Sequence, residues 1–137
     1  MKRKKILIVS AEYYPEITMT METDAIDCLK KWKGFSVDDP RNALENVPGV
    51  FEIPVVISKN IKKYDCFVAL GSIIKGETPH FDFISQATTD AIMKLSIDYK
   101  KPIGNGIITS LNKNQAEVRS KTKGQEAANA VIAVLSK

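Results

Sequence analysis

Several features are scarce in this sequence of 137 residues, and each absence argues against a class of protein. No apolar run approaches the length of a membrane-spanning helix, so no transmembrane segment is expected. The basic start leads into only a short apolar stretch before Glu12, which is too little for a signal peptide. Internal repeats and low-complexity tracts are absent as well. We therefore expect a soluble, cytoplasmic protein without a membrane partner.

Cysteine is equally scarce. Cys28 and Cys66 are the only two and form no CxxC motif, which predicts reduced, buried thiols in a cytosolic protein. The aromatic signatures of RNA-binding modules are missing. The net charge is +4, but Lys and Arg look scattered along the chain, and the densest cluster, residues 2–5, is typical of a solvated end. No nucleic-acid partner is therefore expected.

The remaining composition, 44% hydrophobic and 26% charged, is that of an ordinary globular protein. The length fits one domain over residues 1–137 with a core of its own. Short apolar runs predict strands over residues 6–9, 66–71 and 103–109. Apolar residues at three- and four-residue spacing predict helices over residues 21–32, 79–98, 114–121 and 125–135, the last two broken near Gly124.

Two segments are harder to assign. Residues 35–47 are poorly patterned, and only the apolar positions of 43–47 indicate a strand. Residues 50–57 are β-branched and short, which favours a strand, but the alternation of strands and helices demands a helix with Pro54 in its first turn. We adopt the helix.

The resulting order predicts a four-stranded parallel sheet with helices on both faces. Ligands of such sheets bind outside the carboxyl ends of the strands, and we place the loops 11–15, 48–52, 71–80 and 104–106 there. Gly104 and Gly106 leave room for another group to approach the backbone.

The stretch 66–84 is the most informative part of the sequence. After the strand and Gly71, Thr78 suits a helix N-cap and Pro79 the first helical position. A helix N-terminus that follows a glycine-bearing loop favours an anion such as phosphate. His80, the only histidine, falls in the first turn of that helix. A proton-transfer group beside an anion site predicts a reaction centre.

Several blocks of sequence together resemble the lumazine synthase family. They are residues 47–54 (VPGVFEIP), 76–82 (GETPHFD), 105–109 (NGIIT) and 123–128 (KGQEAA). The resemblance extends over roughly residues 5 to 135. It implies a three-layer, flavodoxin-like α/β domain without cofactor or metal.

The implied reaction is the penultimate step of riboflavin biosynthesis. It condenses 5-amino-6-(D-ribitylamino)uracil with 3,4-dihydroxy-2-butanone 4-phosphate to give 6,7-dimethyl-8-ribityllumazine, phosphate and water. Family members assemble as pentamers with each active site between neighbouring subunits, and some form icosahedral shells of sixty subunits. Because the N-terminus lacks the residues that add a strand in shell-forming members, we expect a pentamer. Riboflavin synthase is a candidate partner.

The resemblance also implies roles for single residues that bind the pyrimidine substrate. Tyr13 matches an aromatic that stacks on the pyrimidine ring. Val50, Phe51 and Glu52 match the segment that binds the ribityl chain, with the Glu52 carboxylate accepting hydroxyl hydrogen bonds. Ile73 and Ile74 match a strand end whose backbone faces the ring.

A second group of residues matches the phosphate and proton-transfer site. Glu77 and Thr78 match the phosphate loop, His80 the proton-transfer residue and Glu126 an acidic residue near it. Arg119 matches an arginine that reaches the phosphate from the adjacent subunit.

Two departures from the family pattern concern residues expected near the neighbour's site. Lys123 matches a lysine close to the phosphate, but its spacer from Arg119 is about four residues shorter than the family norm. Asn105 stands where many relatives carry a Phe that frames the neighbouring subunit's site.

Two other functions stay open. The short spacer favours a flavin- or lumazine-binding relative without turnover. A flavodoxin-like signalling or FMN domain would share only the sheet, and the first loop lacks the phosphate cradle that it needs.

Overall fold

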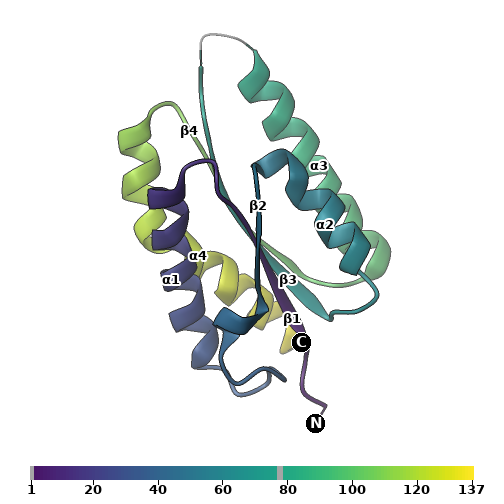
Figure 1. Cartoon of the computed structure of the whole chain (residues 1–137). Helices are drawn as coiled ribbons and strands as arrows, with labels where there is room; N and C mark the ends of the chain where they lie inside the picture. The colour runs from purple at the N-terminus through teal and green to yellow at the C-terminus, as the bar shows by residue number, and fades with distance from the viewer. Residues whose placement is uncertain (1, 77–78) are drawn as a thin grey trace.

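The computed structural model describes residues 2–76 and 79–137, in which one parallel sheet lies between two pairs of helices (Figure 1). The strands are β1 (Ile6–Ala11), β2 (Leu44–Val47), β3 (Cys66–Ile74) and β4 (Ile103–Ser110), in the order β2-β1-β3-β4. All three pairings are parallel, which confirms the predicted flavodoxin-like α/β sheet.

The helices are α1 (Pro15–Lys30), α2 (Ile53–Asn60), α3 (His80–Tyr99) and α4 (Lys113–Leu135). Two short 3₁₀ turns, η1 (Pro40–Ala43) and η2 (Val50–Glu52), precede β2 and α2. Helices α1 and α4 pack on one face of the sheet and α2 and α3 on the other, so each face has its own apolar core (Figure 1). For the ambiguous segment 50–57 the choice of a helix with Pro54 in its first turn is confirmed, but the α-helix begins only at Ile53, after the 3₁₀ turn η2. None of the helices built from the described residues is long and apolar enough to cross a lipid bilayer.

The predicted break near Gly124 is wrong, because α4 is one continuous helix of 23 residues. Gly124 is buried where α4 lies against α1, and a Cβ there would collide with the Met21 carbonyl oxygen and come within 2.7 Å of the Ala25 nitrogen. The glycine therefore permits a close approach of two helices and does not end one. Asp24 adds a polar tie, since its carboxylate accepts a 2.7 Å hydrogen bond from the Gln125 backbone N–H.

The basic residues are also arranged differently from our expectation. Fourteen of the twenty Lys and Arg, but only four of the sixteen Asp and Glu, fall in residues 2–5, 30–43, 59–65, 98–102 and 137. These segments lie where strands begin and helices end, at the end of the molecule that carries both chain termini (Figure 1). They are scattered in the sequence but gathered by the fold, and cations at helix C-termini are favourable there.

Candidate active site

A cavity of about 370 Å³ opens at the carboxyl ends of β1 and β3. Its walls come from the β1–α1 loop, the segment around η2, the end of β3 and the first turn of α3. It is lined by Tyr13, Tyr14, Gly49, Val50, Phe51, Glu52, Ser72, Ile73, Ile74, Gly76, His80, Phe81 and Ile84. It thus lies at the end of the sheet where ligands of parallel α/β proteins bind.

The floor of the cavity is the part of β3 that extends beyond β1. The β1–β3 ladder ends at the pair Ser10–Leu70, whereas β3 stays paired with β4 as far as Ile74. After Ala11 the chain turns towards β2, and the Glu12 N–H donates to the Val47 carbonyl at 2.9 Å. The last residues of β3 therefore have a strand on one side only, and Ser72, Ile73 and Ile74 line the cavity. A planar ligand could hydrogen-bond to such a strand edge.

Two tyrosines form one wall. The rings of Tyr13 and Tyr14 meet edge to face, with centroids 4.9 Å apart and an interplanar angle of 77°. Tyr14 is half-buried against the α1 side of the core, whereas Tyr13 is 72% exposed. An exposed aromatic face beside a cavity can stack on a heterocycle.

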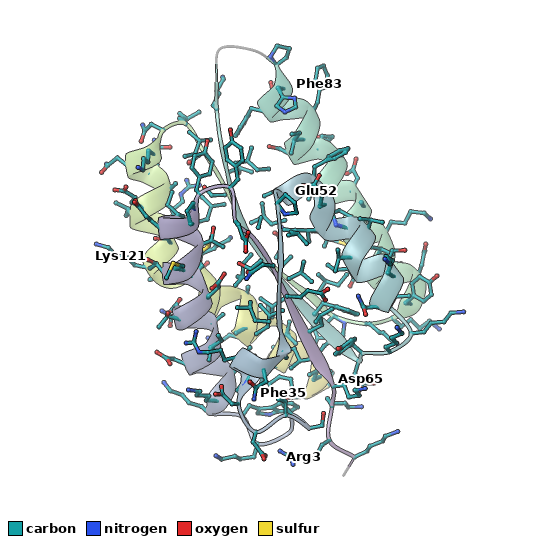
Figure 2. The ribbon with its side chains drawn as sticks, viewed as in Figure 1. Arg3, Phe35, Glu52, Asp65, Phe83 and Lys121 are labelled. Carbon is teal, nitrogen blue, oxygen red and sulfur yellow. The ribbon has the colours of Figure 1, made fainter. Side chains whose placement is uncertain are left out.

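The segment 49–52 forms the facing wall. Gly71 makes room for it, because a Cβ at Gly71 would lie 2.6 Å from Cγ2 of Val50. Glu52 is half-buried and turns back towards Gly49, whose Cβ position would be 3.3 Å from its carboxylate. Glu52 and the α3 residue Phe83 both lie at the cavity end of the molecule, opposite Arg3 and Asp65 (Figure 2). The wall thus offers a carboxylate that can accept hydrogen bonds from hydroxyl groups.

The first turn of α3 completes the cavity. His80 is the first residue of α3, lines the cavity and is exposed in the single chain. The helix begins one residue later than predicted, so that Pro79 is its N-cap and not its first helical residue. Glu77 and Thr78, the predicted phosphate loop, lie outside the described residues. The N-terminus of this 20-residue helix carries a partial positive charge, so an anion beside His80 is electrostatically favoured.

Comparison with known proteins shows to which family this chain belongs. The model of the 6,7-dimethyl-8-ribityllumazine synthase family matches residues 3–137. The chain belongs to that family. Proteins with that name include one from Helicobacter acinonychis, 36% identical over 97% of this chain and 87% of its own length. Another, from Bdellovibrio bacteriovorus, is 35% identical over 98% of this chain and 75% of its own. A third, from Corynebacterium urealyticum, is 35% identical over 93% and 80%.

In this family member four of the predicted site residues stand apart from the cavity of their own chain. Arg119 lies on α4, where its Nη1 donates a 2.8 Å hydrogen bond to the Thr109 carbonyl of the edge strand β4. Lys123 is half-buried on the same helix. The Glu126 carboxylate accepts a hydrogen bond from the Thr122 hydroxyl. None of the three lines the cavity within one chain.

Asn105 is the fourth of these residues, and its predicted position in a loop is wrong. Residues 104–106 lie in the first half of β4, opposite Val68–Leu70, and not at its carboxyl end. The Asn105 Oδ1 accepts a 3.1 Å hydrogen bond from the Ile107 N–H of its own strand. Gly104 admits α4, since a Cβ there would collide with the Ala127 carbonyl. Gly106 makes room for the neighbouring strand, since its Cβ would lie 2.6 Å from Cδ2 of Leu70 on β3.

Sequence reasoning missed several lining residues, among them Tyr14, Ser72, Phe81 and Ile84. The helical spacing of Ile84 from His80 was a usable signal, because residues four apart share a helix face. Ser72 was hidden because the predicted strand ended at residue 71.

Neither cysteine lines the cavity. Cys66 is buried in β3, and burial, with Asp65 adding to it, raises the pKa of its thiol to about 12. Cys28 is half-buried rather than fully buried as expected, and partial burial raises the pKa of its thiol as well. Among the described residues, no group of three or more His, Cys, Asp or Glu side chains could hold a metal ion.

Proposed function

We propose that this lumazine synthase family member condenses 5-amino-6-(D-ribitylamino)uracil with 3,4-dihydroxy-2-butanone 4-phosphate in the cavity at the end of β3. The products are 6,7-dimethyl-8-ribityllumazine, phosphate and water. One observation carries the proposal: a tyrosine wall, a strand edge, a carboxylate and the only imidazole of the chain line the same cavity. These groups match one substrate that combines a heterocycle with a polyol chain and a second substrate that carries a phosphate.

The pyrimidine substrate is held along the strand edge. Tyr13 stacks on the ring, and the backbone of Ile73 and Ile74 hydrogen-bonds to its edge. The ribityl chain follows the segment Val50–Glu52, where the Glu52 carboxylate accepts hydrogen bonds from hydroxyl groups. The aromatic amine is already nucleophilic, so its orientation dominates catalysis, and such positioning is worth ~7–11 kcal/mol. The cavity of about 370 Å³ supports a bound molecule of this size.

The butanone phosphate lies at the N-terminus of α3. Its phosphate is held by the helix end, by the loop of Glu77 and Thr78, and by Arg119 of a neighbouring subunit. His80 moves protons during imine formation, phosphate elimination and ring closure, a contribution of roughly 10²–10⁴-fold. Lys123 and Glu126 act near the same phosphate from the neighbour.

We further propose a cytoplasmic pentamer in which each active site lies between two subunits. Arg119 supports this assembly, because its guanidinium lies at the β4 edge of the sheet and away from the cavity of its own chain. Exposed apolar side chains support it too, since Phe83, Met93 and Ile97 on α3 are each more than half exposed. In this pentamer Asn105, on the edge strand β4, faces the neighbour's site. The lumazine product is then consumed by riboflavin synthase, the proposed partner enzyme.

The test mixes both substrates with the purified protein and follows lumazine absorbance and fluorescence. We expect turnover in the wild type and a loss of roughly 10²-fold or more in His80→Asn. Glu52→Gln should raise the KM of the pyrimidine substrate and leave that of the butanone phosphate unchanged. Binding of the pyrimidine without product would instead identify a binding protein. A solution mass of 15.2 kDa, rather than five times that value, would refute the pentamer.

A further inference from the structure

The β1–α1 loop places Tyr13 at the cavity, but few neighbouring groups hold the Tyr13 ring in one position. The Tyr13 side chain is 72% exposed, and a ring with so few neighbours can adopt several staggered rotamers. Only some of these rotamers present the ring face to the cavity, so any contact that selects one of them improves binding of a flat ligand.

The backbone on both sides of Tyr13 is fixed. The hydroxyl of Thr18, a residue only 1% exposed, lies 2.8 Å from the Ala11 carbonyl oxygen and 2.9 Å from the Tyr14 carbonyl oxygen. The Thr18 N–H donates to the same Tyr14 carbonyl at 3.0 Å. The Glu12 N–H is bound to the Val47 carbonyl. These bonds anchor the loop before and after Tyr13 and leave its side chain as the movable part.

Tyr14 is the fixed aromatic ring beside that movable one. It occupies the N-cap position of α1 and is half-buried against the core of the α1 face. Its edge-to-face contact with Tyr13, at 4.9 Å and 77°, is the arrangement that the ring quadrupoles favour. Of the two rings, we expect the half-buried Tyr14 to set the geometry of the contact and the exposed Tyr13 to follow it.

We infer that Tyr14 is a positioning residue that sets the affinity for the pyrimidine ring by holding Tyr13 against the cavity. The inference rests on the proposed function, which supplies the flat substrate on which Tyr13 stacks. Loss of the Tyr14 ring should weaken binding of the pyrimidine substrate about two- to tenfold, the range expected for an aromatic pair. The KM of the butanone phosphate should stay unchanged.

A double-mutant cycle tests the inference. Binding of 5-amino-6-(D-ribitylamino)uracil is measured by calorimetry for the wild type, Tyr13→Leu, Tyr14→Leu and the double variant. Tyr14→Leu should weaken binding in the wild-type background and have no further effect once Tyr13 is Leu. Tyr14→Phe keeps the ring and should bind like the wild type. The matched control is Tyr99→Leu, an exposed tyrosine on the last turn of α3 outside the cavity.

Two results would overturn the inference. Equal losses from Tyr14→Leu in both backgrounds would mean that Tyr14 contacts the substrate directly, and no loss in either would mean that it does not position Tyr13. Should Tyr14→Leu fold poorly in urea titrations, Tyr14→Met replaces it in the cycle, because its unbranched side chain also removes the ring but adapts better to the space left behind. Turnover by the wild type with an additive cycle refutes this inference alone. No binding of the pyrimidine substrate by the wild type refutes the proposed function as well.

Discussion

Gly124 lies where α1 contacts α4, and two explanations of this glycine predict opposite changes in the free energy of unfolding when it is replaced by alanine. If Gly124 loosened the helix, alanine would stabilise the protein by up to about 1 kcal/mol, the difference in helix propensity. The structure predicts the opposite. A Cβ would collide with the Met21 carbonyl oxygen, and its 2.7 Å separation from the Ala25 nitrogen would have to open to about 3.4 Å. Both atoms belong to main chain, so no rotamer change relieves the contact.

Overpacking of this kind costs about 1–3 kcal/mol, and we place Gly124→Ala near the upper limit because two helices must separate. After the propensity gain, the net loss of unfolding free energy should be about 2 kcal/mol, or roughly 6–8 °C in Tm. Urea titration of Gly124→Ala against Gly76→Ala measures it, since a Cβ at Gly76 meets nothing within 4 Å. A Gly124→Ala protein as stable as the wild type would refute the close approach of α1 and α4.

Three further predictions concern charged and titratable groups. Asp24→Ala removes the carboxylate that binds the Gln125 N–H and should cost about 1–2 kcal/mol of unfolding free energy in urea titrations. Arg119→Ala should lower kcat/KM for the butanone phosphate by roughly 10–100-fold, and unchanged kinetics would mean that the short spacer displaces the arginine from the phosphate. The buried Cys66 thiol, whose pKa is raised from 9.0 to about 12, stays protonated when an unfolded thiol ionises. Unfolding free energy should therefore fall between these pH values by up to about 1.4 kcal/mol per pH unit, and Cys66→Ala should lack that component.

The sheet could be predicted from sequence because its strands are buried on both faces. The six residues of β1 are all buried, and a continuous apolar run is the direct consequence. The end of β3 was missed because Gly71 and Ser72 interrupt the apolar run, although the strand continues to Ile74 along β4 alone. The start of α1 at Pro15 was missed because the apolar spacing used to find the helix began only at Met21.

The positions of residues 50–52 and of His80 at the cavity could also be predicted, since both lie in segments that we placed at the carboxyl ends of strands. Asn105 could not, because Gly104 and Gly106 indicated a loop at the carboxyl end of a strand, with room for another group to approach the backbone. In the fold that room is taken by the Ala127 carbonyl of α4 and by Leu70. A glycine pattern shows that something comes close to the backbone, but the identity of that group is a tertiary property.

The direction of the helices links the cavity to the distribution of charge. Each helix follows a parallel strand and returns antiparallel to it, so all four helix N-termini point to the cavity end and all four C-termini to the basic end. Lysines at the C-termini offset the negative ends of the helix dipoles. The rest of the sequence holds only six of the twenty Lys and Arg but twelve of the sixteen Asp and Glu. A phosphate at the cavity therefore cannot rely on the net charge of its surroundings. Under the proposed function, the phosphate is bound by local groups instead, namely the N-terminus of α3 and the cation that we propose Arg119 brings from a neighbouring chain.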